Sequence, residues 1–352
     1  MTLQKSKVVW LVDGSPNPNL PSRRLRVFAM MPLINSWFDQ SHYTMPRTIF
    51  QFFKLRKFLK EAQIIILQKE LPSFYILWLL KRLKASLVYD FDDAVYIRHV
   101  TRLDHGYTLS GKLSRRFSRV CKSVDLIFAG NKILAHVAHI NGAKNVMVLP
   151  TSVPLPSLAK REGNDSKSEL VKLGWVGSKL NLFYLESIEN VLLNLQRKNI
   201  NFKLLVMSDR APKFKEFSNY EFIQWSPDDE LTFLNSIDIG LMPLKNNAYT
   251  QGKCAYKALQ YMSFGKPVVV SDVGVNAEWI NGAGFSVGSN GEMEQALFSL
   301  ISDSQLRGDF GSRAIDLIRN KFERNLLADQ LKDALLSLID QPFKDGTFGV
   351  KI

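Results

Sequence analysis

The chain has 352 residues, 46% of them hydrophobic, and a formal net charge of +13. This length and composition predict an ordinary globular protein of about two domains, with enough apolar residues for two cores. Two cysteines, Cys121 and Cys254, are too few for a disulfide scaffold and lack the spacing of a structural zinc site, so we expect a reducing compartment. The five-residue apolar run after the first lysines is too short for a signal peptide, and no later stretch is long enough to span a membrane.

The positive charge is confined to the first half of the chain. Residues 1–150 hold 23 Lys and Arg against 9 Asp and Glu, whereas residues 151–352 hold 23 against 24. Each basic residue near an anionic bilayer contributes about 1 kcal/mol of attraction, so a membrane surface suits this half, and an ordinary solvated surface is the alternative. Nucleic acid is not expected, because we find no recognition motif for it. We expect a cytoplasmic protein, peripheral to the inner face of the plasma membrane. The basic clusters are Arg23, Arg24, Arg26; Lys54, Arg56, Lys57, Lys60; Lys81, Arg82, Lys84; and Lys112, Arg115, Arg116, Arg119, Lys122.

The first 150 residues alternate between apolar strands and helices. Such alternation predicts a doubly wound parallel sheet. Gly14 lies in the loop after the first predicted strand. The expected strands are 7–12, 63–67, 86–90, 125–129 and 145–149, and the expected helices are 22–37, 47–60, 72–83 and 131–140.

A second alternation follows a stretch that is first proline-rich and then polar, which we interpret as an interdomain linker. The expected strands are 170–176, 202–207, 221–225, 237–242 and 267–271, and the expected helices are 181–197, 228–235, 253–264, 297–301, 305–320 and 323–339. The predicted organisation is a Rossmann-like domain at 1–150, a linker at 151–168, a second Rossmann-like domain at 169–322 and a C-terminal helix within 323–352.

The most informative stretch runs from Gly252 to Gly274 and combines a cationic helix start with a buried strand. If 253–264 is helical, Lys253, Lys257 and Gln260 fall on one face. Side chains lean toward a helix N-terminus, so both ammonium groups would converge near unpaired backbone N–H groups. This arrangement predicts a diphosphate site, and the alternative is a surface helix with two solvated lysines.

The runs DIGLMPL and GKCAYKALQYMSFGKPVVVSDVGVN, together with PSRRLRV, YDFDDA and AGNKILA, resemble bacterial family-4 glycosyltransferases. The resemblance covers most of the chain and is strongest at 174–274. It implies the GT-B fold, an α/β architecture in which two Rossmann-like doubly wound domains face a central cleft. It also implies that the N-terminal domain binds the acceptor, that the C-terminal domain binds a nucleotide sugar, and that the last helix crosses back to the first domain.

The resemblance also assigns expected contacts to individual residues. Many family members carry two glutamates that touch the donor sugar and the ribose, but here those positions are Gly252 and Gln260. The missing carboxylates leave the lysines and backbone groups to hold the donor. The expected contacts are Gly177, Ser178, Lys179, Gly252, Lys253 and Lys257 for the diphosphate; Trp225 and Gln260 for the nucleoside; Tyr249, Gln251 and Gly252 for the donor sugar; and Gly14, Arg23 and Arg24 for the acceptor.

Acidic residues follow the predicted strand 86–90, where many family members carry a histidine that touches the donor sugar. Asp90 and Asp92 also fit the short Asp-x-Asp pattern with which unrelated glycosyltransferases hold Mg²⁺ or Mn²⁺. We favour a metal-free role in which Asp90, Asp92 and Asp93 contact sugar hydroxyls, and we predict Asp92, Asp93 and Lys257 as catalytic residues. His99 and His105 lie in an expected loop and are weaker candidates.

The implied reaction is transfer of a sugar from a nucleotide diphosphate sugar to a glycan or lipid-linked acceptor, in cell-surface polysaccharide or glycoconjugate synthesis. The resemblance implies retention at the anomeric carbon and no metal or other cofactor. If transfer inverts instead, Asp92 or Asp93 is the expected base. The alternatives are a metal-dependent Asp-x-Asp glycosyltransferase, a sugar-nucleotide epimerase, and a non-catalytic module that binds a nucleotide sugar or a membrane. The sequence does not predict the oligomeric state.

Overall fold

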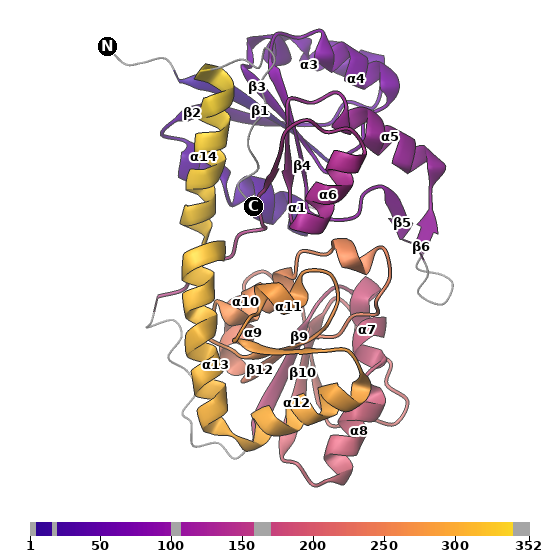
Figure 1. The fold of residues 1–352 in the computed structure, drawn as a ribbon, viewed down its shortest axis with the longest axis vertical. Helices are drawn as coiled ribbons and strands as arrows, with labels where there is room; N and C mark the ends of the chain where they lie inside the picture. The colour runs from indigo at the N-terminus through magenta and orange to yellow at the C-terminus, as the bar shows by residue number, and fades with distance from the viewer. Residues whose placement is uncertain (1–4, 16–19, 100–106, 158–169, 341–352) are drawn as a thin grey trace. The chain divides into compact units, whose positions relative to one another are not determined.

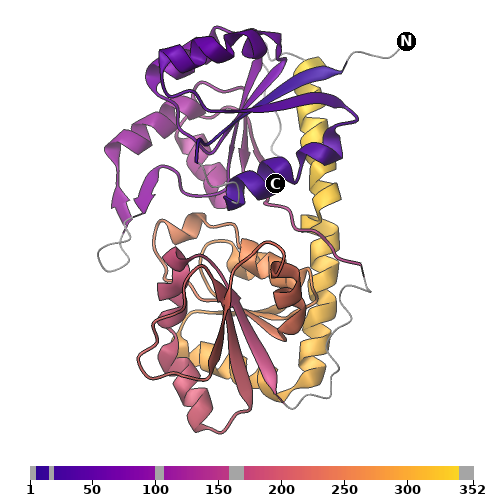
Figure 2. The same cartoon turned by 180° about the vertical axis from the view of Figure 1, so that it is seen from behind.

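The computed structural model describes residues 5–15, 20–99, 107–157 and 170–340. The chain divides into two compact units, shown as ribbons in Figures 1 and 2. Unit 1 comprises Met1–Ser152, Gly252–Cys254 and Arg324–Ile352, and unit 2 comprises Val153–Gln251 and Ala255–Glu323. Among the described residues, no helix combines the length and the apolar character that crossing a membrane requires.

Unit 1 is built on a six-stranded sheet of order β2-β1-β3-β4-β7-β8, whose neighbouring strands are all parallel. This order reverses between β1 and β3, as in doubly wound folds of the flavodoxin type. The strands are β1 (Ser6–Val12), β2 (Phe38–Thr44), β3 (Ile64–Gln68), β4 (Ser86–Phe91), β7 (Leu126–Ala129) and β8 (Val146–Val148), and a separate antiparallel pair is formed by β5 (Ile97–His99) and β6 (Tyr107–Leu109).

Most of the longer helices of unit 1 begin at polar capping side chains. Thr48 forms a capping box with Gln51, and Ser73, Ser110 and Asn131 each accept a backbone N–H in the first turn of their helices. The helices are α1 (Pro21–Arg23), the π-helix η1 (Arg24–Phe28), α2 (Met31–Ile34), α3 (Ile49–Glu61), α4 (Phe74–Lys81), α5 (Gly111–Cys121), α6 (Lys132–Ile140) and α14 (Arg324–Asp340).

The last helix, α14, completes the core of unit 1. Leu327, Leu331, Leu335 and Leu338 recur every three or four residues and pack with buried side chains of β1 and β3, such as Trp10. The C-terminal helix is therefore part of the same hydrophobic core as the first strand.

Unit 2 has a six-stranded sheet of order β11-β10-β9-β12-β13-β14, again parallel throughout. Counted within the unit, this is the order 3-2-1-4-5-6 of the Rossmann fold, which reverses between β9 and β12. The strands are β9 (Val171–Val176), β10 (Phe202–Ser208), β11 (Tyr220–Gln224), β12 (Ile239–Met242), β13 (Val268–Ser271) and β14 (Gly284–Val287).

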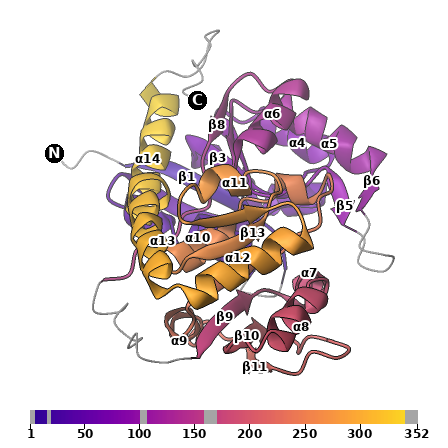
Figure 3. The same cartoon turned by 60° about the horizontal axis from the view of Figure 1, so that its bottom comes forward.

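The core of unit 2 lies between its sheet and the packed helices α8 and α12, which Figure 3 shows from a second direction. Leu192 and Leu195 of α8 and Leu297 and Leu300 of α12 are fully buried in it. The helices are η3 (Lys179–Asn181), α7 (Leu182–Glu186), α8 (Glu189–Arg197), α9 (Glu230–Ser236), η4 (Thr250–Gly252), α10 (Tyr256–Met262), α11 (Asn276–Trp279), α12 (Asn290–Ser302), α13 (Ser304–Leu317) and the π-helix η5 (Ile318–Phe322).

Several predicted elements differ from the observed ones. The helix expected at 22–37 is broken into α1, η1 and α2, and the polar strand β2, the hairpin strands β5 and β6, and helix α5 were not predicted. His99 lies in β5 rather than in the expected loop, and His105 lies outside the described residues. Most of the predicted linker also lies outside the described residues.

Candidate functional site

The strand order of unit 2 indicates where a ligand would bind. In doubly wound sheets ligands bind beyond the carboxyl ends of the strands, at the point where the order reverses. In unit 2 this point lies between β9 and β12, which end at Val176 and Met242. Gly177, Ser178 and Lys179 follow β9 directly, so three predicted diphosphate residues lie at this edge.

Tyr261 holds helix α10 against these two strands. Its hydroxyl accepts a hydrogen bond from the backbone N–H of Val176, the last residue of β9, at 2.8 Å. Its ring occupies the space beside Gly240 of β12, where an added Cβ would lie only 2.2 Å from Tyr261 Cδ2. Burial raises the pKa of Tyr261, so its hydroxyl stays protonated. Lys257 lies one turn before Tyr261, on the same side of α10.

Four side chains from three segments, Lys257 among them, form one connected group of polar contacts. Its Nζ donates to Gln260 Oε1 at 3.1 Å and lies 3.7 Å from Glu230 Oε1 at the start of α9. Trp225 Nε1 donates to the same Glu230 oxygen at 3.4 Å. We call Trp225, Glu230, Lys257 and Gln260 the Lys257 cluster. It joins the buried carboxylate of Glu230 to the ammonium group of Lys257, whose side chain is 31% exposed.

The sequence predicted three members of this cluster and missed Glu230. The residues around it, SPDDE, have the composition of a solvated turn, which explains the omission. The fold nevertheless buries Glu230, and Ser226 helps to shape the turn by accepting the backbone N–H of Asp229 at 3.1 Å. Glu230 is therefore an additional candidate for contact with a nucleotide.

The loop after β9 is held by contacts within unit 2. The N–H of Gly177 donates to the Met207 carbonyl at 3.1 Å, and a Cβ on Gly177 would lie 2.6 Å from the Trp175 ring. The backbone N–H of Lys179 donates to the carboxylate of Asp209, and Lys179 Nζ lies 3.7 Å from the other carboxylate oxygen. The Lys179 side chain is 58% exposed, which leaves it accessible to an anion.

The predicted helix start at Lys253 is wrong. Helix α10 begins at Tyr256, and Ala255 before it adopts a left-handed backbone with φ of 46°. Lys253 is therefore not helical, and the expected face shared by Lys253, Lys257 and Gln260 does not exist. Lys257 and Gln260 alone share α10.

The three residues before Ala255 belong to unit 1 and are held there by Asn131. Its Nδ2 donates to the carbonyls of Gly252 and Lys253 at 3.2 and 3.1 Å. The thiol of Cys254 donates to the backbone carbonyl of Asp92 at 3.2 Å. Burial raises the pKa of Cys254, so this thiol is not a nucleophile at neutral pH.

Gly252 has a packing reason to be glycine. An added Cβ would lie 3.0 Å from Ala94 Cβ and 3.2 Å from Leu134 Cδ2. Any larger side chain therefore requires these neighbours to move, which accounts physically for the absence of a glutamate at this position.

The other residues predicted to contact the donor sugar lie in a tight loop before Gly252. Asn247 Oδ1 accepts the backbone N–H groups of Tyr249 and Thr250, both at 3.0 Å. Gln251 is exposed and donates to Asn246 at 3.1 Å, while Gly274 packs against its carbonyl. Lys266, in contrast, is buried and donates to the Asn235 carbonyl at 3.0 Å, so this lysine of the Gly-Lys-Pro turn is structural.

In unit 1 the strand order reverses between β1 and β3, and the loop after β1 carries Gly14. A Cβ on Gly14 would lie 2.9 Å from Thr44 Cγ2. Arg23 Nη1 donates to the carbonyls of Asp13 and Ser15 at 3.4 Å each, so Arg23 shapes this loop. Arg24 follows Arg23 at the start of η1 and is half-buried.

Lys69 follows β3 and forms ion pairs with the acidic residues that follow β4. Lys69 Nζ donates to Ser22 Oγ at 3.0 Å and lies 3.4 Å from Asp93 Oδ2 and 3.6 Å from Asp92 Oδ1. Burial lowers the pKa of Lys69, but the charges of Asp92 and Asp93 outweigh it and raise the pKa above its usual value. The structure therefore brings both predicted catalytic aspartates together with a cation that the sequence did not indicate.

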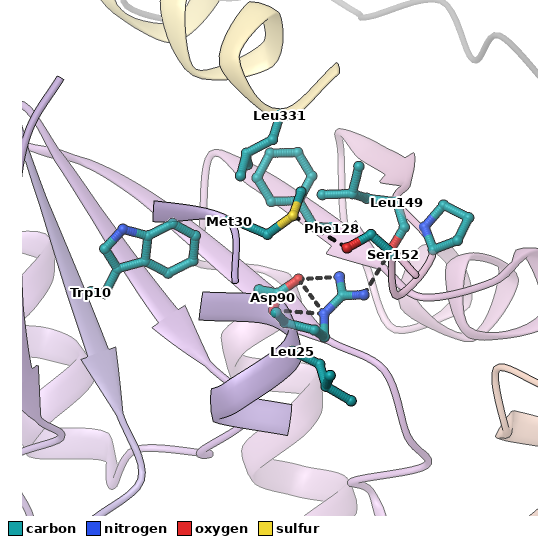
Figure 4. Close-up of a pocket in the computed structure, with 10 residues that line it drawn as sticks. Trp10, Leu25, Met30, Asp90, Phe128, Leu149, Ser152 and Leu331 are labelled. Atoms are coloured by element: carbon teal, nitrogen blue, oxygen red, sulfur yellow. Dashed lines mark hydrogen bonds and ion pairs between the residues drawn. The ribbon is translucent and has the colours of Figure 1, made fainter. Parts of the chain in front are cut away.

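Asp90 does not belong to this group, contrary to the expectation that it contacts sugar hydroxyls. Its carboxylate lies inside unit 1 and pairs with Arg26, whose Nε donates to Oδ2 at 2.9 Å and whose Nη2 donates to Oδ1 (Figure 4). Burial lowers the pKa of Arg26, but the charge of Asp90 outweighs it and raises the pKa, so Arg26 stays charged. Both Asp90 oxygens are thus engaged, which removes one half of the Asp-x-Asp metal pattern. Among the described residues, no group of acidic, His or Cys side chains is arranged to hold a metal.

Comparison with solved structures shows the fold. The structure of a glycosyltransferase from Rickettsia africae matches with a TM-score of 0.71 at 14% identity, covering 96% of this chain and 100% of that one. HepE from Anabaena, solved with UDP and glucose, matches with a TM-score of 0.69 at 14% identity over 95% and 100% of the two chains. Sucrose-phosphate synthase from Thermosynechococcus elongatus matches with a TM-score of 0.63 at 11% identity over 96% and 100%. No curated protein matches the sequence.

The model of the family described as glycosyl transferases group 1 matches residues 172–303. The similarity to this family is therefore shown for residues 172–303, which lie in unit 2 apart from Gly252–Cys254. The solved structures show that the chain has the GT-B fold. The matched residues run from β9 to α12 and contain the whole Lys257 cluster.

Proposed function

We propose that this chain is a glycosyltransferase that moves a sugar from a UDP-sugar to a glycan or lipid-linked acceptor, with retention at the anomeric carbon and without a metal. The observation that carries the proposal is the Lys257 cluster, which places a cation, a buried carboxylate, an amide and an indole at the switch point of unit 2. HepE has been solved with UDP and with UDP-glucose, which supports uridine diphosphate as the nucleotide.

In this proposal Lys257 binds the diphosphate and stabilises its negative charge as it leaves. Glu230 and Gln260 accept hydrogen bonds from the ribose hydroxyls, and Trp225 contacts the base. Glu230 thus supplies a carboxylate that Gln260 lacks. We keep the remaining donor contacts that the sequence predicts. These are Gly177, Ser178, Lys179, Gly252 and Lys253 for the diphosphate and Tyr249, Gln251 and Gly252 for the sugar.

Unit 1 binds the acceptor in this proposal, and Gly14, Arg23 and Arg24 line its site. Asp92 and Asp93, oriented by Lys69, stabilise positive charge that develops on the sugar. A retaining reaction needs no basic side chain, because the leaving phosphate takes the acceptor proton. Cell-surface polysaccharide or glycoconjugate synthesis at the inner face of the membrane is the proposed setting.

The test is a titration of the wild type and of Lys257→Ala with uridine, UMP, UDP and UDP-glucose. A charge-assisted hydrogen bond contributes about 1.5–3 kcal/mol, so Lys257→Ala should weaken UDP binding by about 10–150-fold. Uridine binding should change little, because uridine has no phosphate. Transfer to an acceptor should survive EDTA.

Lys203→Ala is the matched control. Lys203 is 37% exposed and pairs with Glu221 at 3.1 Å, much as Lys257 pairs with Glu230, but it lies near the amino end of β10. The control should bind UDP like the wild type. Equal losses in both variants, or wild-type UDP affinity in Lys257→Ala, would show that Lys257 does not hold the diphosphate, and activity abolished by EDTA would refute the metal-free mechanism.

A further inference from the structure

Two neighbouring helices of unit 1, α3 and α4, expose large aromatic side chains. On α3 and α4, Phe50, Phe53, Phe74, Tyr75 and Trp78 are between 44% and 69% exposed. Helix α3 packs against α4 and α4 against α5; in Figure 1, α3 and α4 lie along the top of unit 1 and α5 lies at its right. We call the exposed side chains of these helices and of the residues that flank them the α3–α5 face. Large exposed aromatic side chains that gather on neighbouring helices indicate an interaction site.

The same face is strongly basic. Across 47–61, 74–84 and 111–122 the chain carries thirteen Lys and Arg and one acidic residue. That residue, Glu61, is already paired with Lys7 at 2.6 Å. The basic residues are Arg47, Lys54, Arg56, Lys57, Lys60, Lys81, Arg82, Lys84, Lys112, Arg115, Arg116, Arg119 and Lys122.

The basic and aromatic groups are interleaved rather than separate. Lys54 Nζ lies 4.5 Å from the centre of the Phe50 ring, and the Arg82 guanidinium lies 3.8 Å from the Trp78 ring. Arg119 of α5 lies 5.8 Å from the Phe74 ring of α4, which joins two of the helices. Phe50, Trp78 and Phe74 therefore each have a cation beside them, so rings and charges can meet the same partner.

We propose that the α3–α5 face binds the surface of an anionic phospholipid bilayer. Aromatic rings favour the region between the acyl chains and the headgroups, while Lys and Arg pair with the phosphates above them. A protein partner fits less well, because seven of the thirteen basic residues are lysines, which are depleted in protein interfaces. The inference stands on this face alone and does not rest on the identity of the donor.

The first experiment is flotation of the full-length chain with two kinds of vesicle, phosphatidylcholine alone and phosphatidylcholine with phosphatidylglycerol. The wild type should float with the second kind only. Lys54→Gln/Lys57→Gln should weaken binding by about 25-fold, because each lost charge should weaken it by about fivefold. Phe50→Ser/Phe53→Ser should weaken it by about tenfold or more, because two exposed rings no longer reach the acyl region.

The matched control, Lys213→Gln/Phe298→Ser, removes an exposed lysine and an exposed phenylalanine from unit 2. It should bind like the wild type. The proposal is overturned if the wild type does not float with anionic vesicles, if the control loses as much binding as the α3 variants, or if Phe50→Ser/Phe53→Ser binds like the wild type.

Insertion of the aromatic side chains into the bilayer is measured separately, by tryptophan fluorescence. Lipids brominated on the acyl chains should quench the Trp78 emission, and Trp78→Phe should lose that quenched fraction. The alternative is that a second copy of the chain covers the α3–α5 face, and light scattering tests it by measuring the mass in solution. A wild type that dimerises and α3 variants that do not would overturn the lipid assignment. UDP binding by the α3 variants should equal that of the wild type, so failure of either proposal is distinguishable from failure of the other.

Discussion

Replacing Asp90 by asparagine should destabilise unit 1 strongly, because it leaves Arg26 without its counter-charge. The side chains of both residues are only 4% exposed. Arg26 also donates to the Leu149 carbonyl at 3.0 Å and to Thr151 Oγ1 at 3.1 Å, so the guanidinium cannot turn to solvent without losing these bonds. Breaking a buried ion pair on one side costs about 3–5 kcal/mol. At about 2–4 °C per kcal/mol for a unit of this size, the melting temperature should fall by about 6–20 °C.

The assay is scanning calorimetry of the full chain, with two comparisons. Asp316→Asn breaks an Asp–Arg contact of 3.0 Å whose partners are 65% and 56% exposed, so it should cost less than about 1 kcal/mol. The double variant Arg26→Met/Asp90→Leu removes both buried charges and should recover most of the loss. Equal shifts for Asp90→Asn and Asp316→Asn, or a double variant that melts no higher than the single one, would refute the structural role of Asp90.

Two further predictions concern Glu189 and Gly252. Burial raises the pKa of Glu189, but backbone N–H groups of Lys215, Glu216 and Phe217 donate to its Oε1 at 2.6–3.0 Å and bring the pKa below its usual value. Its carboxylate therefore stabilises the fold fully above the unfolded pKa of about 4.3. Glu189→Gln should lower the melting temperature by a few degrees at pH 7, and the difference between variant and wild type should vanish as the pH falls below about 4.3. A difference that does not change with pH would contradict this. Gly252→Ala should cost about 1–3 kcal/mol in thermal unfolding by overpacking, whereas Gly308→Ala, in an open part of α13, should be neutral or stabilising, and equal effects would contradict the packing argument.

Buried strands were predictable because their apolar runs have few other interpretations. The expected strands 7–12 and 86–90 agree with β1 and β4 to within one residue at each end. Strand β2 was missed because it lies at the edge of the sheet. Most of its residues are polar, and after Phe38 they are exposed or half-buried. Helix α5 was missed because basic residues obscure an apolar stripe that includes Phe117 and Val120.

The candidate site was only partly predictable, because tertiary contacts decide which polar groups are buried. Lys257 and Gln260 share a helix and were expected to lie together. Glu230 was missed because only the packing of α9 distinguishes it from the acidic residues before it. The start of α10 was misplaced because the left-handed backbone of Ala255 is unusual for alanine, and nothing in its own chemistry predicts it.

Each of the two departures from the common family pattern, Gly252 and Gln260, has a physical explanation of its own. A side chain at Gly252 would require Ala94 and Leu134 to move. Gln260 is 5% exposed, and its Oε1 shares the ammonium of Lys257 with the buried Glu230. A glutamate at 260 would place a second carboxylate next to Glu230 with one cation between them, which is unfavourable in a buried site. The neutral amide at 260 is therefore compatible with the buried acid at 230, because only one of the two side chains that share Lys257 is negatively charged.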